Sequence, residues 1–300
     1  MSINNLSNIL KENNISFLLD EPMKNHTSFK IGGNADIFIE PNSEEQVKQA
    51  IFACKQWNIN YIFLGKGSNV LVNDNGIRGA VICISTKCSG IVKIDDTSFY
   101  ATAGTPLLKI CKYALENSLS GLEFAYGIPG TLGGAIYMNA GAYGGEFKDV
   151  TLSCKCLDKD GNIIVLSADK LNFSYRHSIF TNSEYCILGA TIKLNSGNSL
   201  SIKEKMDTNL KARSDKQPLD YPSAGSTFKR PQGSYASLLI DNCNLKGYRV
   251  GDAQISEKHA GFVINLGNAS CDDVLKLIDQ VKTKVLSQTG FVLEPEIKII

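Results

Sequence analysis

Residues 127–146, GIPGTLGGAIYMNAGAYGGE, form the most distinctive stretch of this sequence and limit the fold that it can adopt. Seven of the 26 glycines of the chain fall inside it. Neither a simple hairpin nor a helix needs so many glycines, because glycine weakens both elements and suits positions where the backbone approaches another group closely. We therefore expect a backbone surface against which a flat ring or a diphosphate can lie. A buried crossover between tightly packed elements is the alternative.

Two polar residues of this stretch, Thr131 and Asn139, are suited to bond the polar edges of such a ligand. The glycines expected to permit the close approach are Gly127, Gly130, Gly133, Gly134 and Gly141.

A second glycine-containing stretch, LGKGSNVLV at 64–72, follows a predicted strand. Backbone N–H groups at Gly65 and Gly67 can turn inward to form an anion-binding nest, to which Ser68 and Asn69 add donors. This arrangement suits a diphosphate. The P-loop and the Rossmann turn are excluded because both open a helix, whereas VLV predicts a strand. A plain tight turn remains the alternative.

The composition is that of an ordinary globular protein. The chain has 300 residues, of which 43% are hydrophobic and 20% charged, which is enough for two or three domains. The formal net charge of +1 provides no overall field for nucleic acid, so we expect no nucleic-acid partner. Lys229 and Arg230 form a local pair that could meet an anion.

The nine cysteines have no C-x-x-C spacing, and we expect them to be reduced. The first residues lack a signal-peptide pattern and no apolar run approaches the roughly 18 residues that a membrane span needs, so we expect a cytoplasmic protein without a membrane span. The histidines at 26, 177 and 259 lack metal-ligand spacing, and no metal is expected.

Three domains are predicted, at 1–80, 81–200 and 201–300. The first combines a helix, strands and a helix capped by Ser43. The second is rich in strands, contains a DKDGN hairpin, and has one clear helix, predicted to begin at Thr105 as its N-cap. The third begins with a charged helix and ends in the strand FVLEPEIKII. Between them we predict a helix that is capped by Ser270 with Asp273 and closed by Gly290.

The ordered motifs HTSFKIGG, LGKGSNVLV, GIPGTLGGAIYMNAGAYGGE, FSYRHSIF, AGSTFKRP, GDAQISEKHAGFVIN and LEPEIKII resemble those of the UDP-N-acetylenolpyruvoylglucosamine reductase (MurB) family. The resemblance runs from about residue 20 to the end of the chain. It implies an α+β fold, in which an FAD-binding domain of the vanillyl-alcohol-oxidase/p-cresol-methylhydroxylase type, with two α/β subdomains, precedes a C-terminal α+β substrate-binding domain.

The resemblance also implies the cofactors. The GKGSN turn would hold the FAD pyrophosphate, and the segment from 127 to 142 would line the flavin. No histidine or cysteine stands out as a covalent tether, so we expect non-covalent FAD, with NADPH as the hydride donor. The implied cofactor-binding residues are Gly65, Lys66, Gly67, Ser68, Asn69, Gly127, Pro129, Gly130, Thr131, Gly133, Gly134, Asn139 and Gly141.

The implied reaction reduces UDP-N-acetylglucosamine enolpyruvate to UDP-N-acetylmuramate, a peptidoglycan precursor. Hydride addition leaves negative charge on the carboxylate-bearing carbon, which must be stabilised and then protonated. By the resemblance, Arg176 grips the substrate carboxylate, Glu296 shares this work with a raised pKa, and Ser226 donates the proton. From the residues alone, Arg176 could be a surface arginine, Glu296 a partner of Lys298, and Ser226 part of a turn.

Four further residues are predicted to contact substrate: Tyr175, Lys229, Arg230 and His259. For His259, which could contact the phosphates of NADPH, a packed structural histidine is the alternative. The chain lacks the insertion that supplies a tyrosine-bearing loop in one subgroup of the family, so it resembles the shorter subgroup. We expect a monomer or a weak dimer. The functional alternatives are an FAD-dependent oxidase and a nucleotide-binding protein without catalysis.

Overall fold

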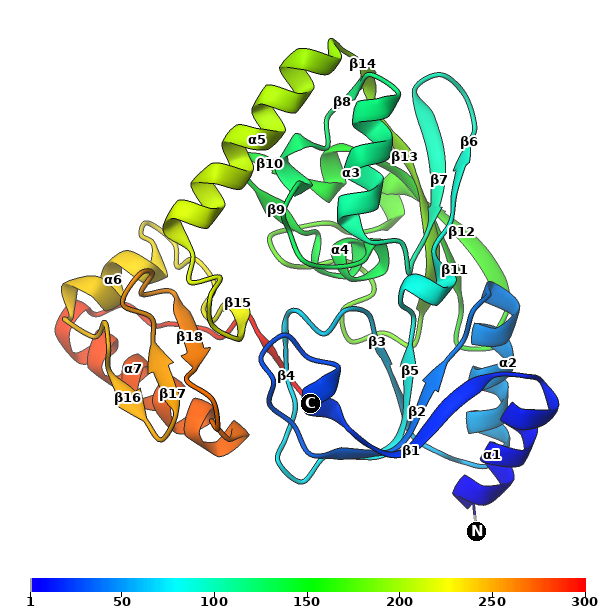
Figure 1. Ribbon diagram of the computed structural model, residues 1–300, viewed down its shortest axis with the longest axis horizontal. Coiled ribbons are helices and arrows are strands. Elements are labelled where there is room, and N and C mark those ends of the chain that lie inside the picture. The colour runs from blue at the N-terminus through cyan, green and yellow to red at the C-terminus, as the bar shows by residue number, and fades with distance from the viewer. Residues whose placement is uncertain (1) are drawn as a thin grey trace. The chain divides into compact units, whose positions relative to one another are not determined.

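Two units, each with its own hydrophobic core, make up the computed structural model, which describes residues 2–300 (Figure 1). Unit 1 consists of the chain up to Leu19, Ile37–Lys66 and Gly79–Ala212. Unit 2 consists of Asp20–Asp36, Gly67–Arg78 and Arg213–Ile300.

The helices are α1 (Ser2–Glu12), α2 (Glu44–Gln56), α3 (Leu107–Glu116), α4 (Leu132–Met138), α5 (Ser199–Lys216), α6 (Ala236–Asn242) and α7 (Cys271–Thr289). The strands are β1 (Ser16–Pro22), β2 (Asn34–Glu40), β3 (Tyr61–Leu64), β4 (Val70–Leu71), β5 (Ile77–Cys83), β6 (Ile91–Lys93), β7 (Ser98–Thr102), β8 (Leu119–Ser120), β9 (Gly141–Ala142), β10 (Gly145–Glu146), β11 (Thr151–Leu157), β12 (Ile163–Ser167), β13 (Cys186–Lys193), β14 (Asn195–Ser196), β15 (Ser223–Ser226), β16 (Arg249–Val250), β17 (Ala253–Ile255), β18 (Phe262–Asn265) and β19 (Lys298–Ile299).

Unit 1 contains a five-stranded sheet in the order β12-β11-β13-β7-β6, and all its pairs are antiparallel. The predicted DKDGN hairpin is confirmed, because β11 pairs with β12 across it. Helix α4 packs on β13 and β7. The predicted strand–helix–strand unit is confirmed as well: Ser43 caps α2 by accepting from the N–H of Gln46, and β3 then pairs in parallel with β5.

Unit 2 is built on the antiparallel sheet β15-β18-β17-β16, against which α7 packs. The predicted boundaries of α7 are confirmed. Ser270 and Asp273 form a capping box at its start, and Gly290 ends it with a φ of 74°, a left-handed conformation that glycine adopts at little cost. The core of unit 2 includes Phe29, Ile31 and Leu71, so segments 20–36 and 67–78 fold with the C-terminal residues. The predicted division of the chain into three domains, with boundaries at residues 80 and 200, stays a prediction.

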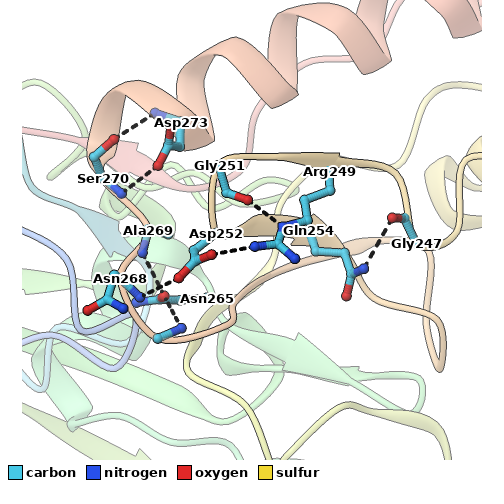
Figure 2. A network of polar contacts seen from close by, with 11 residues as sticks. Gly247, Arg249, Gly251, Asp252, Gln254, Asn265, Asn268, Ala269, Ser270 and Asp273 are labelled. Atoms are coloured by element: carbon cyan, nitrogen blue, oxygen red, sulfur yellow. Dashed lines mark hydrogen bonds and ion pairs between the residues drawn. The ribbon is translucent and has the colours of Figure 1, made fainter.

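Figure 2 shows how the β16–β17 hairpin is fastened to the start of α7. Arg249 pairs with Asp252, whose other carboxylate oxygen accepts from the N–H of Asn268 at 3.0 Å. The amide oxygen of Asn265 accepts from the N–H groups of Gly267 and Ala269. The bonds from the N–H groups of Gly267, Asn268 and Ala269 satisfy backbone donors in the turn that leads to Ser270, so the turn is held from the sheet side.

Two sequence predictions about element ends are wrong. Helix α3 begins at Leu107 with Pro106 as its N-cap, because the buried hydroxyl of Thr105 donates to the carbonyl oxygen of Gly90 at 3.0 Å instead of capping. The last strand is confined to β19, which pairs in parallel with β4. Pro295, which has no N–H, forms only an isolated bridge with Phe228.

All nine cysteines are free and buried. Among residues 2–300 no helix has both the length and the apolar character to cross a bilayer.

Thiol ionisation should make the free energy of unfolding depend on pH. Burial raises the pKa of Cys83, Cys88 and Cys156 from 9.0 to about 11. Between pH 9 and 11 these thiols ionise in the unfolded chain but stay protonated in the folded one, so stability should fall over that interval. Urea denaturation at pH 8, 9 and 10 with a reductant would measure this fall. A Cys83→Ala variant should show a shallower decrease; an unchanged slope would contradict the prediction.

Candidate active site

The two glycine-containing stretches meet in unit 1. Gly65 directly follows β3, and a Cβ placed on it would lie 2.6 Å from the side-chain oxygen of Thr131. Thr131 is buried and is the N-cap residue of α4. Because neither the backbone of β3 nor this buried side chain can move away easily, only glycine fits at position 65. Gly65, in the stretch 64–72, thus lies against the start of α4, in the stretch 127–146.

The stretch 127–146 contains a regular helix, α4, followed by the hairpin β9–β10. Gly133 explains part of its glycine content: its N–H donates to the carbonyl of Ala103 at 2.8 Å, and a Cβ there would lie 3.0 Å from that of Ala103. Gly134 differs, because it is exposed and a Cβ on it would meet nothing closer than 3.9 Å. Packing therefore requires glycine at position 133, whereas the glycine at position 134 leaves the backbone accessible.

Gly67, Ser68 and Asn69 belong to unit 2. Gly67 has a φ of 62°, and a Cβ on it would lie 2.1 Å from the carbonyl oxygen of His26. Its own carbonyl accepts from the N–H of Ser28 at 3.1 Å. The turn is therefore held by the HTSFKIGG segment, which lies about 40 positions earlier in the chain.

Replacing Gly67 by alanine should lower both stability and FAD retention. The φ of 62° alone costs about 1–2 kcal/mol, and the contact with His26 forces the backbone to shift as well. Gly290→Ala is the matched control, because Gly290 has a φ of 74° with no atom within 4 Å of a Cβ. Urea denaturation of both variants, with the flavin absorbance that remains after gel filtration, tests this. If Gly67→Ala were no less stable than Gly290→Ala and kept its full flavin content, the contact with the carbonyl of His26 would not matter.

Ser226 and Glu296 lie together in unit 2. Ser226 ends β15, and the N–H of Glu296 donates to the carbonyl of Thr227, the next residue, at 2.8 Å. Asn69 joins them: its side-chain amide donates to the carbonyl of Glu296 at 3.3 Å, and its own carbonyl accepts from Lys298. The predicted pyrophosphate turn and two predicted catalytic residues are thus connected within one unit.

The strand that carries Ser226 leaves space beside it. Gly225 has a φ of 78°, and no atom lies within 4 Å of a Cβ placed there. Thr227 faces the other way, since its buried hydroxyl accepts from the N–H of Val263 at 3.0 Å. The register of β15 against β18 shifts between Ser223 and Ser226, which is typical of strands that redirect a side chain next to a site.

Arg176 lies in unit 1, at the tip of a turn bridged by Ser174 and His177. Its φ is 55°, which is uncommon for a residue with a side chain. The guanidinium lies 5.0 Å from the ring centroid of Tyr175 and donates to the carbonyl of Gly141 at 3.4 Å. The predicted carboxylate-binding arginine therefore sits beside the segment predicted to line the flavin.

The predicted substrate contacts of unit 2 are already engaged with protein groups. Lys229 pairs with Glu294 at 3.1 Å, and Arg230 stacks over the ring of Tyr235 at 4.3 Å. His259 packs edge-on to Phe262, its Nδ1 accepts from the N–H of Gly261, and burial lowers its pKa. A neutral, packed imidazole favours the structural alternative over a contact with phosphates.

The side chain of Asn139 bonds within the protein, and its predicted contact with the cofactor stays a prediction. The side chain of Asn139 is fully buried, and its amide group donates to Glu146 and to the carbonyl of Ser174, so its donors point into the protein and not toward a ligand. Tyr143 occupies the β9–β10 turn with a φ of 50° and is half exposed. An aromatic residue thus stands where such a turn favours Asn or Gly.

Comparisons with known proteins show the family to which the chain belongs. A family model described as "FAD binding domain" matches residues 35–167, and one described as "UDP-N-acetylenolpyruvoylglucosamine reductase, C-terminal domain" matches residues 217–300. A UDP-N-acetylenolpyruvoylglucosamine reductase of Caldanaerobacter subterraneus subsp. tengcongensis is 50% identical over 298 residues, which is 99% of this chain and 97% of that protein. The chain belongs to the UDP-N-acetylenolpyruvoylglucosamine reductase family.

Other members of the reductase family are similar to this chain over most of its length. The protein of that name from Clostridium novyi (strain NT) is 50% identical over 93% of this chain and 90% of its own length. The crystal structure of the reductase (MurB) from Thermus caldophilus has a TM-score of 0.79 at 33% identity, and the match covers 95% of this chain and 98% of that one.

Family membership confirms several predictions: the α+β fold with an FAD-binding domain and a following C-terminal domain, FAD as cofactor, and a flavoprotein oxidoreductase as the enzyme class.

Proposed function

We propose that this protein uses NADPH and non-covalently bound FAD to reduce the enolpyruvyl group of UDP-N-acetylglucosamine enolpyruvate, giving UDP-N-acetylmuramate for peptidoglycan synthesis. The main support is the identity with reductases of this name over nearly the whole chain. The structural observation that carries the residue roles is the bond from the N–H of Glu296 to the carbonyl of Thr227, which brings Glu296 next to Ser226.

The residues around the two glycine-containing stretches fit FAD. Gly134 leaves its backbone accessible, and the left-handed conformation of Gly67 is one in which successive N–H groups can converge on a diphosphate. When bound, the flavin accepts a hydride from the nicotinamide and passes a hydride to the substrate. The contribution of the chain is to hold the ring and the diphosphate and to exclude water.

Three residues would handle the charge that hydride addition creates. Arg176 would hold the substrate carboxylate through two N–H groups and keep its charge as the enolate develops. Glu296 would share this work in its protonated form, a state that stays a prediction. Ser226 would pass its hydroxyl proton to the carbanionic carbon, since a hydroxyl at the end of a fixed strand can be aimed at one atom.

The first experiment follows the visible absorbance of the flavin anaerobically, during addition of NADPH and then of the enolpyruvyl sugar nucleotide. Loss and then recovery of the flavin band would support both half-reactions. If the band bleached but the sugar nucleotide could not restore it, the proposed substrate would be wrong. Rapid restoration by oxygen alone, with no response to the sugar nucleotide, would favour an oxidase.

Three statements stay predictions from the sequence: that the protein belongs to the shorter subgroup, that it is cytoplasmic, and that it is a monomer or a weak dimer.

A further inference from the structure

Asn139 closes the C-terminal end of α4 in unit 1. It has a φ of 42°, and its backbone N–H bonds to the carbonyls of Ala135 and Ile136. Its side chain has no exposure to solvent. A buried amide needs partners for both of its hydrogens and for its oxygen, and here all of them come from other segments of the unit.

The partners of this amide are specific. Nδ2 donates to Oε2 of Glu146 at 2.7 Å and to the carbonyl of Ser174 at 3.1 Å, while Oδ1 accepts from the N–H of Lys148 at 2.9 Å. Glu146 is held in turn by an ion pair with Lys148. The end of α4 is thus tied at once to the β10 strand and to the turn that carries Arg176.

A second bond joins the same two elements on the other side of Arg176. The buried hydroxyl of Ser178 donates to the carbonyl of Tyr137, in the last turn of α4, at 2.8 Å. The residues on both sides of the Tyr175–Arg176 tip, Ser174 and Ser178, are therefore anchored to one helix end.

The Arg176 turn needs such anchors. Its tip residue has a φ of 55°, an unfavourable conformation that persists only where the surroundings impose it. The guanidinium also reaches the carbonyl of Gly141, two residues beyond Asn139. A loose turn would let the guanidinium leave the direction that a bidentate grip requires.

We infer that Asn139 is a positioning residue for Arg176: its amide fixes the turn so that the guanidinium is preorganised for the substrate carboxylate. This inference rests on the proposed function, which gives Arg176 that contact. Asn139 touches neither substrate nor cofactor in this role, and it acts through the carbonyl of Ser174.

The test is a double-mutant cycle on the two half-reactions, measured by anaerobic stopped-flow absorbance. The variants are Asn139→Gly, which retains the left-handed conformation without the amide, Arg176→Ala, and both together. Asn139→Gly should slow flavin reoxidation by the enolpyruvyl sugar nucleotide by up to about 100-fold, a loss that misplacement by about 1 Å can cause. Flavin reduction by NADPH should stay within about twofold of the parent rate, and the double variant should be no slower than Arg176→Ala.

Two further variants make the result specific. Ser178→Ala removes the second anchor with a minimal change, so it should slow the same half-reaction even if Asn139→Gly does not fold. Asn209→Ala is the matched control, since Asn209 is another buried asparagine of unit 1 whose amide donates to a backbone carbonyl, that of Glu123. It should leave both half-reactions unchanged.

Distinct outcomes overturn different statements. If the Asn139→Gly and Arg176→Ala effects multiply, Asn139 does not act through Arg176. If Asn139→Gly weakens FAD binding and slows both half-reactions equally, then the Asn139 side chain stabilises the cofactor site and does not position Arg176. If Arg176→Ala alone leaves reoxidation unchanged, the role of Arg176 in the proposed function is wrong.

Discussion

Ser226→Ala should slow flavin reoxidation by the enolpyruvyl sugar nucleotide by about 10²–10⁴-fold, the usual contribution of a positioned proton donor. The change retains the Cβ, and with it the backbone of β15 and its pairing with Phe262. The hydroxyl has no part in hydride transfer from the nicotinamide to the flavin, so reduction by NADPH should keep its rate. Rapid anaerobic mixing of each substrate with the enzyme in turn measures the two rates separately.

Ser223→Ala is the control for this experiment. Ser223 lies on the same strand, and its backbone carbonyl, which the substitution retains, accepts from the hydroxyl of Ser28 at 2.6 Å. Both half-reactions should be normal in this variant. If Ser226→Ala slowed both half-reactions equally, a general disturbance of the site would explain the loss, and Ser226 would not be the proton donor.

Arg176→Lys should slow the same half-reaction by about 10²–10³-fold, the loss seen when one donor to a developing negative charge is removed. Lysine keeps the positive charge but cannot grip a carboxylate through two parallel N–H groups. The strained φ of 55° is equally unfavourable for both residues, so the backbone cost does not change. Stopped-flow reoxidation at several concentrations of the sugar nucleotide would separate weaker binding from slower chemistry.

The matched control is Arg249→Lys in unit 2, because Arg249 pairs with Asp252 and has no proposed contact with a ligand. It should leave both half-reactions at the parent rates. A loss in Arg176→Lys confined to flavin reduction by NADPH would mean that Arg176 contacts the nicotinamide nucleotide and not the carboxylate.

Local signals in the sequence identified most elements of this fold. The Ser43 and Ser270 caps, the DKDGN hairpin and Gly290 at the end of α7 were all predicted, because each depends on residues within a few positions. The N-cap at Thr105 was mispredicted because its hydroxyl bonds Gly90, which no local pattern indicates.

The glycine content of 127–146 was interpreted as a backbone surface for a ligand, with close packing of elements as the alternative, and the ligand contact stays a prediction. Glycine at 133 is required by the packing of α4 against Ala103, a contact between segments distant in sequence. Asn139 was predicted from its residue type as a ligand contact. Its actual partners at Glu146 and Ser174 became identifiable only once the chain had folded.

The sequence by itself determined the elements, the order of the motifs and, through that order, the family and its cofactor. Hydrophobic periodicity, caps and turn chemistry depend on residues that are close together along the chain, so they can be recognised in the sequence. The tertiary structure decided which motifs share a unit: Asn69 bonds to Glu296 although 227 positions separate them, and Gly65 meets Thr131. Such contacts depend on the path of the whole backbone, because a hydrogen bond requires its two atoms within about 3 Å wherever they stand in the sequence.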